Sequence, residues 1–241
     1  MPTSGDGLGD HPLHVVGDAV VAVMLIAGGG DVNVDNGMGL KPLHMASSVG
    51  VASVLLANGA CPFSRTKTGR SSIHWARNDG IARVLLAHGV DANDRISGVG
   101  DTPLLHAHTL EMCKVLVEGG ATVDAVNGQG RTALLRMCEM LGKAPEGGEA
   151  IYVQIVEYLA GVGASFDIVD SAGDGVEQLA GKQYELFVLP IWKRSMVVQM
   201  KKVVEKHGLS HSAEVACRNN NILCMAMAVD GDVRDGITAY V

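Results

Sequence analysis

Apolar residues in this chain gather in short runs, and a glycine follows each run at a regular distance. The runs include Ala19 to Ala27, Val54-Leu55-Leu56, Val84-Leu85-Leu86 and Val115-Leu116-Val117. The glycines that follow apolar runs are Gly29, Gly59, Gly89, Gly120 and Gly163. A run of this length predicts a helix with one buried apolar side. The glycine after it predicts that the helix ends at a residue in the left-handed backbone conformation. The spacing therefore indicates an internal repeat.

A second sequence pattern recurs along the chain at the same spacing. The tetrapeptides that carry it are His11-Pro12-Leu13-His14, Lys41-Pro42-Leu43-His44, Ser71-Ser72-Ile73-His74, Thr102-Pro103-Leu104-Leu105 and Thr132-Ala133-Leu134-Leu135. Proline is favoured at the first helical position, and a preceding Thr or Ser can cap the helix, as we expect for Thr102 and Ser71. Each repeat is therefore predicted to be a pair of helices.

Polar segments connect one predicted helix pair to the next. Asp31-Val32-Asn33, Asp91-Ala92-Asn93 and Val123-Asp124 lead into Gly39, Gly69, Gly100 and Gly130. Polar residues that end in a glycine indicate an extended arm and the tip of a hairpin-like turn.

These residues together resemble the ankyrin repeat family, whose marks are T-P-L-H-x-A, an apolar outer helix and then G-A-D-V-N. Matching stretches are Pro42-Leu43-His44-Met45-Ala46, Leu85 to Asn93 and Gly120 to Asp124. The resemblance covers about residues 6 to 180 and implies an all-α solenoid of helix-turn-helix units joined by hairpin-like turns. Units are expected to start near residues 6, 36, 66, 96, 127 and 170.

The chain departs from the family pattern in three places. Most units have about 30 residues instead of the family's 33, so the inner helix or its turn must be short. Leu141 to Ala150 is inserted in the fifth unit and is expected to form a loop. Val176 to Ala180 fits a degenerate sixth unit, and residues 1–180 are taken as the repeat array. Residues 181–241 are expected to complete the last repeat, with Ile191 to Lys206 as its outer helix and Asn221 to Val241 as a cap.

Composition narrows the choice of partner and compartment. A net charge of −7 with only nine aromatic residues argues against nucleic acid and against an acidic membrane surface. No run is long enough to span a bilayer, and no Lys or Arg precedes Lys41 to form a signal-peptide start. Five cysteines without C-x-x-C spacing suit a reducing compartment. A cytoplasmic or nuclear location is expected.

The sequence carries no motif that predicts catalysis. Phosphate-loop, dinucleotide, nucleophile-elbow and zinc-protease patterns are missing, so we expect neither an enzyme nor a cofactor. His14, His44 and His74 recur once per repeat, and the resemblance implies that they hydrogen-bond the backbone between neighbouring units. The resemblance also places Asn33 and Asn93 where some family members carry a hydroxylated asparagine.

The function expected from the resemblance is protein–protein recognition by an adaptor, scaffold or regulatory subunit. The concave face and turn tips would bind, through Met38, Leu40, Lys67, Arg70, Arg77, Asn78, Asp101, His108, Gln129 and Arg131. The basic members, together with Arg136, favour a partner with an acidic segment. Two alternatives stay open: self-assembly through the uncharged run Ala19 to Ala27, and a calmodulin-like target helix around Trp192 to Lys206.

Overall fold

The computed structural model describes residues 9–196 and 198. The chain divides into two compact units, Met1–Ala133 and Leu134–Val241, which are described separately below. Within the described residues the regular structure is helical, and one isolated antiparallel bridge joins Arg65 and Ser71. This agrees with the all-α class predicted from the sequence.

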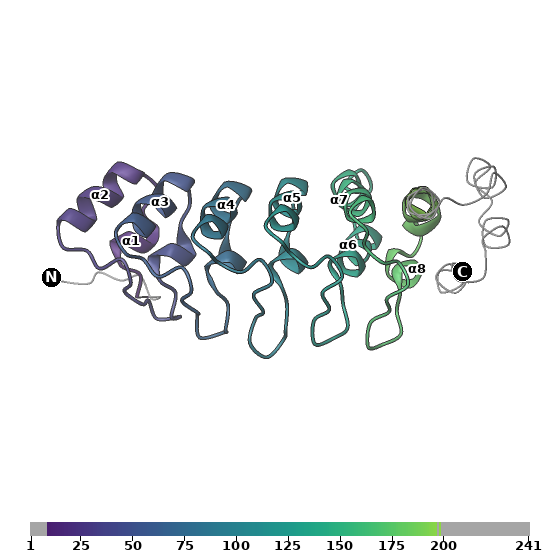
Figure 1. Cartoon of the computed structure of the whole chain (residues 1–241), viewed down its shortest axis with the longest axis horizontal. Coiled ribbons are helices and arrows are strands. Elements are labelled where there is room, and N and C mark those ends of the chain that lie inside the picture. The colour runs from purple at the N-terminus through teal and green to yellow at the C-terminus, as the bar shows by residue number, and fades with distance from the viewer. Residues whose placement is uncertain (1–8, 197, 199–241) are drawn as a thin grey trace, which may run out of the picture. The chain divides into compact units, whose positions relative to one another are not determined.

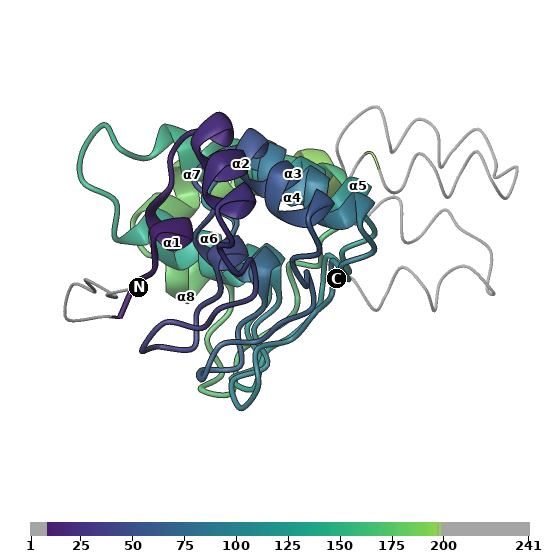
Figure 2. The ribbon, with the colours of Figure 1, turned by 90° about the vertical axis from the view of Figure 1, so that its left-hand side faces the viewer.

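The first unit contains four pairs of helices. The short inner helices are α1 (Pro12–Val15), η1 (Pro42–Met45), η2 (Ser72–Trp75) and η3 (Pro103–His106). The outer helices are α2 (Ala19–Ala27), α3 (Val49–Ala57), α4 (Asp79–Ala87) and α5 (Leu110–Glu118). The outer helices of this unit lie in a row, and the connecting hairpins extend on one side of it (Figures 1 and 2).

Each outer helix begins at a residue whose side chain caps it. The caps are Asp18, Ser48, Asn78 and Thr109, and each side-chain oxygen accepts from a backbone N–H of the first turn. This contact satisfies a donor that would otherwise have no partner in the helix. The predicted stops are confirmed, because Gly29, Gly59, Gly89 and Gly120 all have positive φ.

The inner helices are single turns of four residues, of which η1, η2 and η3 are 3-10 helices. The expected shortening of the repeat therefore falls on the inner helix. The cap predicted at Thr102 is wrong, because its hydroxyl is buried without a hydrogen-bond partner. Ser71 does not cap by its hydroxyl in the expected way either, since that group bonds to His74 and Asp94.

In the first three repeats the third residue of the inner helix is a histidine, which takes the capping role. Nδ1 of His14 and of His44 accepts from the backbone N–H of His11 at 3.0 Å and of Lys41 at 2.9 Å. The same contact at His74, from the N–H of Ser71, is 3.4 Å long. A residue at the third helical position thus satisfies the N–H at the start of its own turn.

The other nitrogen of each histidine reaches the following hairpin, as the family resemblance implied. Nε2 lies 2.8 Å from the Leu40 carbonyl at His14, 3.0 Å from the Ser64 carbonyl at His44 and 3.3 Å from the Asp101 carbonyl at His74. Because Nδ1 accepts a hydrogen bond, the proton of the neutral ring belongs on Nε2. One side chain therefore connects two successive repeats.

Asparagine side chains provide a second connection between repeats. Asn93 donates through Nδ2 to the Gly120 carbonyl at 2.8 Å and accepts from the Thr122 N–H at 2.7 Å. Asn33 makes the same pair of contacts with Gly59 and Cys61, both at 2.9 Å. Each asparagine therefore joins the hairpin arm in which it lies to the segment that follows the next outer helix.

The second unit contains longer and less regular helices. They are α6 (Ala133–Gly142), α7 (Ala150–Gly161), α8 (Val176–Ala180) and the π-helical turn η4 (Tyr184–Val188), after which residues 189–196 are α-helical. The insertion predicted at Leu141 to Ala150 is a loop only over residues 143–149, because α6 extends to Gly142. The sixth inner helix is found where the pattern placed it, at α8.

The helix expected to begin at Ile191 begins earlier than predicted. In η4 the Leu189 N–H bonds to the Tyr184 carbonyl, five residues back, directly before Pro190. A widened turn is a common way to fit a proline into a helix, since proline has no N–H and its ring displaces a carbonyl of the preceding turn. The remainder of the predicted helix and the cap at 221–241 lie outside the described residues. The domain boundary expected at residue 180 stays a prediction.

The asparagine connection makes a testable prediction for stability. Asn93→Ala removes two hydrogen bonds between repeats and should lower the free energy of unfolding by about 1–2 kcal/mol. Asn58→Ala is the matched control, because Asn58 bonds only within its own helix end, to the Val54 carbonyl, among the contacts the structure describes. Urea unfolding followed by circular dichroism measures both. Equal losses for the two variants would contradict the assignment.

Candidate functional site

One side-chain position per repeat lies on the inner helices of the first unit without taking part in the repeated pattern. It is the last residue of each four-residue inner helix and is occupied by Val15, Met45, Trp75 and His106. The position two residues earlier is buried in every repeat, where Leu13, Leu43, Ile73 and Leu104 occupy it. Val15 is exposed and the other three are half-buried. We call these four residues the inner column.

Trp75 is the largest side chain of the inner column. The Arg70 guanidinium carbon lies 5.9 Å from the centre of its ring, within the range of a cation–π contact. Arg77 follows two residues later and is exposed. A half-buried aromatic ring in contact with a cation is the strongest candidate anchor in the first unit. Its signal in the sequence is the change from valine to methionine to tryptophan at one repeat position.

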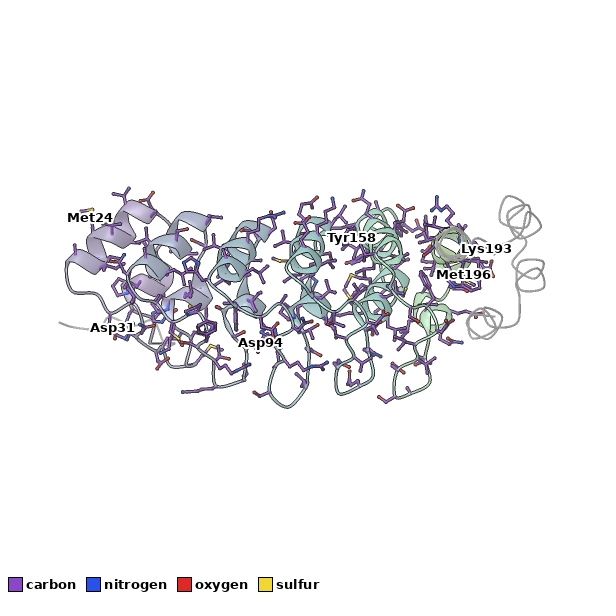
Figure 3. The ribbon with its side chains drawn as sticks, viewed as in Figure 1. Met24, Asp31, Asp94, Tyr158, Lys193 and Met196 are labelled. Atoms are coloured by element: carbon purple, nitrogen blue, oxygen red, sulfur yellow. The ribbon has the colours of Figure 1, made fainter. Side chains whose placement is uncertain are left out.

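Beside Trp75 lies a polar network centred on two aspartates. Asp94 accepts from Arg65 and from the Ser71 hydroxyl, and its carboxylate lies 3.8 Å from His74 Nδ1. Asp101 accepts from Asn127 Nδ2 at 2.7 Å, and its other oxygen lies 3.0 Å from His106 Nε2. Asp94 lies on the hairpin arm after α4, as Figure 3 shows. The network joins the hairpin residues Asp94 and Asp101 to the inner helices η2 and η3.

The predicted contact residues differ in how far they are exposed. Five are exposed, and Arg70 and Arg131 are half-buried; the exposed ones are Met38, Lys67, Arg77, His108 and Gln129. Leu40 is a correction: it is 4% exposed and packs inward, where its carbonyl accepts from His14. Asn78 caps α4, and Asp101 is held by Asn127 and His106. Neither of these two presents an unengaged group to a partner.

Arg65 and Arg95, which were not predicted as contact residues, donate hydrogen bonds to backbone carbonyls. Arg65 Nη1 donates to the Arg95 carbonyl at 3.0 Å, and Arg95 Nη1 donates to the Val126 carbonyl at 2.7 Å. Lys67 Nζ similarly donates to the Gly37 carbonyl of the preceding hairpin at 2.7 Å. These cations connect successive hairpins. The cation in contact with the Trp75 ring is Arg70.

The second unit has its own inner-helix cation and a cavity. Arg136 occupies on α6 the position equivalent to the inner column, and its Nε is buried without a hydrogen-bond partner. A cavity of about 530 Å³ is lined by the end of α7 and by residues that include Ile191, Arg194 and Ser195. Arg194 pairs with Glu157 at 2.8 Å and the Ser195 hydroxyl donates to the Ala160 carbonyl at 3.0 Å. Both contacts fasten the last described helix to α7.

Metal-ligating and membrane-spanning features were also sought among the described residues. No three His, Cys, Asp or Glu side chains in this part of the chain come together as a metal site. In the same residues, no helix combines the length and the hydropathy needed to cross a bilayer.

The three described cysteines are free thiols in different surroundings. Burial raises the pKa of Cys113 and of Cys138 to about 12, so both stay protonated at neutral pH. Cys61 is exposed, and a hydrogen bond with the Ser64 side chain lowers its pKa. The buried pair therefore serves as small apolar core residues.

Comparisons with known proteins agree with this architecture. The family model "Ankyrin repeat" matches residues 38–67. The chain is similar to the crystal structure of the human ASB11 ankyrin repeat domain, with a TM-score of 0.66 over 77% of this chain and 84% of that chain, at 24% identity. This level of identity concerns the fold alone. None of the curated proteins compared with the chain matches it.

The matched repeat and the shared fold identify the chain as an ankyrin repeat protein with an all-α solenoid fold. Ankyrin repeats are in general protein–protein interaction modules, whose stacked units present extended binding surfaces.

The buried histidines predict a dependence of stability on pH. Burial lowers the pKa of His44 and of His74 below the ordinary 6.5. The unfolded chain therefore binds protons more readily, so stability is full above pH 6.5 and falls as the pH drops through the lowered values. Protonation also converts Nδ1 from an acceptor into a donor that faces a backbone N–H.

Thermal unfolding followed from pH 7.5 to 5 should show this loss. A His44→Gln/His74→Gln variant should start with a lower melting temperature and lose less of it on acidification. If the variant and the original chain lose the same amount, the two histidines are not the titrating groups.

Proposed function

We propose that this protein is a non-enzymatic recognition module that holds a partner protein against the inner column and the adjacent hairpin tips of its first unit. The partner segment it fits is acidic and carries an apolar side chain. The adaptor or scaffold role is the one expected from the sequence. The proposed contact surface is centred on Trp75.

The observation that carries the proposal is the chemical change along the inner column. Buried neighbours such as Leu43 and Ile73 repeat the same apolar type because stacking requires it. Two positions later the residue changes from Val15 to Met45, Trp75 and His106, although each is the last residue of a one-turn inner helix. Side chains that packing leaves free to vary are available for recognition, and the rigid stack loses little entropy on binding.

Charge supports an acidic partner. The protein as a whole has a net charge of −7, yet the Arg70 guanidinium lies over the Trp75 ring of the inner column, and Arg77 follows Trp75 by two residues in the sequence. Arg70 is already positioned over the Trp75 ring, so its guanidinium is pre-oriented toward a carboxylate that approaches the same site. Aromatic and arginine side chains together are the usual composition of energetically dominant contacts.

The calmodulin-like alternative for the helix around Trp192 to Lys206 has less support. In the described part of that helix Ile191 and Met196 are buried, and Ser195 is bonded to α7. Over residues 191–196, the apolar side that a calmodulin-type partner would bind is therefore occupied within the second unit.

A paired capture experiment tests the proposal. The full chain and an Arg70→Glu/Arg77→Glu variant are used as baits in lysate of the source cell, and the captured proteins are quantified by mass spectrometry. We expect a partner that the variant retains at least about tenfold less, since each charge contact at such a site contributes roughly 1–3 kcal/mol. Trp75→Ala should reduce capture of the same partner.

The matched control is Arg83→Glu/Lys114→Glu, which makes the same change in net charge on the outer helices. Both of these cations are at the protein surface and form only solvent-accessible pairs, with Glu118 and Glu111. Capture lost equally by the control and the test variant would indicate a general charge effect and contradict the site. A partner retained by every variant would place the contact elsewhere.

A further inference from the structure

The second repeat lacks the asparagine that connects the first and third repeats to their successors. The turns after α2, α3 and α4 comprise residues 32–33, 62–63 and 92–93, so Asn33, Phe63 and Asn93 occupy the same position. Asn33 and Asn93 each make two hydrogen bonds to the next repeat. A phenyl ring has no hydrogen-bonding group, so Phe63 cannot make these contacts.

The backbone groups that would meet an asparagine at position 63 are the Gly89 carbonyl and the Asp91 N–H. Asn33 precedes its two partners by 26 and 28 residues, and Phe63 precedes Gly89 and Asp91 by the same intervals. Within residues 9–196 neither of these two backbone groups bonds to another protein group, and both residues are exposed. The third repeat therefore presents an acceptor and a donor that a side-chain amide satisfies in the second and fourth repeats.

The Phe63 ring is not needed to hold its hairpin arm in place. Arg65, in the same arm, donates through Nη1 to the Arg95 carbonyl at 3.0 Å and through Nη2 to the Asp94 carboxylate. These contacts join the second repeat to the third. Phe63 itself is 61% exposed. An accessible aromatic ring of this kind suits contact with another protein, since aromatic residues are enriched in interfaces.

The two open backbone groups define the chemistry of a ligand. A primary carboxamide donates through its nitrogen and accepts through its oxygen, so one such group bonds to a carbonyl and an N–H together. The chain contains this arrangement already, because Asn93 meets the Gly120 carbonyl at 2.8 Å and the Thr122 N–H at 2.7 Å. A carboxylate only accepts, so it would face the Gly89 carbonyl without a proton to share. The ligand group is therefore neutral, unlike the acidic segment proposed for the inner column.

We propose that Phe63, the Gly89 carbonyl and the Asp91 N–H form a binding site for a partner protein segment with an asparagine or glutamine beside an apolar residue. We call these three residues the amide site. The partner's carboxamide takes the place that Asn33 and Asn93 fill in their own repeats, and its apolar side chain packs on the Phe63 ring. None of the three residues belongs to the inner column, so the inference goes beyond the proposed function.

Nuclear magnetic resonance of the isotope-labelled full chain tests the amide site directly. The probe is the tripeptide Leu-Asn-Leu with acetyl and N-methylamide ends, in which the asparagine carries the single primary carboxamide. We expect a saturable shift of the Asp91 amide resonance with a dissociation constant of about 1 mM, because two hydrogen bonds and one ring contact bind weakly. The matched peptide Leu-Asp-Leu should bind at least about tenfold more weakly, since it cannot donate to Gly89.

The Phe63→Asn variant fills the amide site from within the chain. Its new side chain should bond to Gly89 and Asp91 as Asn33 and Asn93 bond to their partners. We expect slower hydrogen exchange of the Asp91 amide, a higher urea midpoint and no shift on addition of Leu-Asn-Leu. Val99→Asn is the matched control, because it adds the same group at another exposed apolar residue and should change neither exchange at Asp91 nor peptide binding.

Four results would overturn the proposal. Equal binding of Leu-Asn-Leu and Leu-Asp-Leu would show that the carboxamide is not what is recognised. Unchanged exchange of the Asp91 amide in Phe63→Asn would show that position 63 does not face the open pair. Undiminished peptide binding by that variant would place the peptide elsewhere. An Asp91 resonance that does not move at any peptide concentration would leave water as the partner of both groups.

Discussion

The structure depends on a constraint that acts at every repeat: one helix pair is too small to bury its own apolar face, so each must be covered by the next. In the first unit the outer helices meet through residues such as Leu55, Ile81 and Leu85, all at most 1% exposed. Apolar packing alone does not fix the spacing or rotation of successive pairs. The polar contacts of His14, His44 and His74 do, because each ring joins the start of its own turn to a carbonyl of the following hairpin. This works only with a neutral ring whose proton is on Nε2.

The same constraint explains which features could be predicted from the sequence. The repeat length, the bounds of α2 and the positive-φ glycines follow from positions at which backbone geometry or burial admits few residue types. Gly69 illustrates this: its φ is +76°, and an added Cβ would lie 2.5 Å from the Ser97 side chain. Such positions can be predicted from the sequence because almost any substitution there would destabilise the fold.

The candidate site was predicted less well, for reasons that individual residues show. Leu40 was expected at the surface because it follows a turn tip, but the hairpin closes through its carbonyl and turns its side chain inward. Arg70 and Arg131, at the same repeat position, remain half-buried because their long side chains carry the charge back to solvent. Asn78 was read as a contact residue although it caps α4. Trp75 was not among the contact residues predicted from the sequence, although the change from Val15 to Met45 to Trp75 can be read directly after the aligned tetrapeptides.

The length of the inner helix decides how many of its residues pack between repeats and how many remain at the surface. In the first unit the inner helix is a single turn. The inner-column residue is the last residue of that turn, so its side chain need not pack between repeats. In the second unit α6 has ten residues, and Met137, Cys138 and Leu141 in its added turns are buried. Shortening the inner helix removes core positions without disturbing the outer row. The first unit therefore has a surface whose side chains can change with little cost in stability, while the end of its row, at α2, keeps the apolar character that stacking requires.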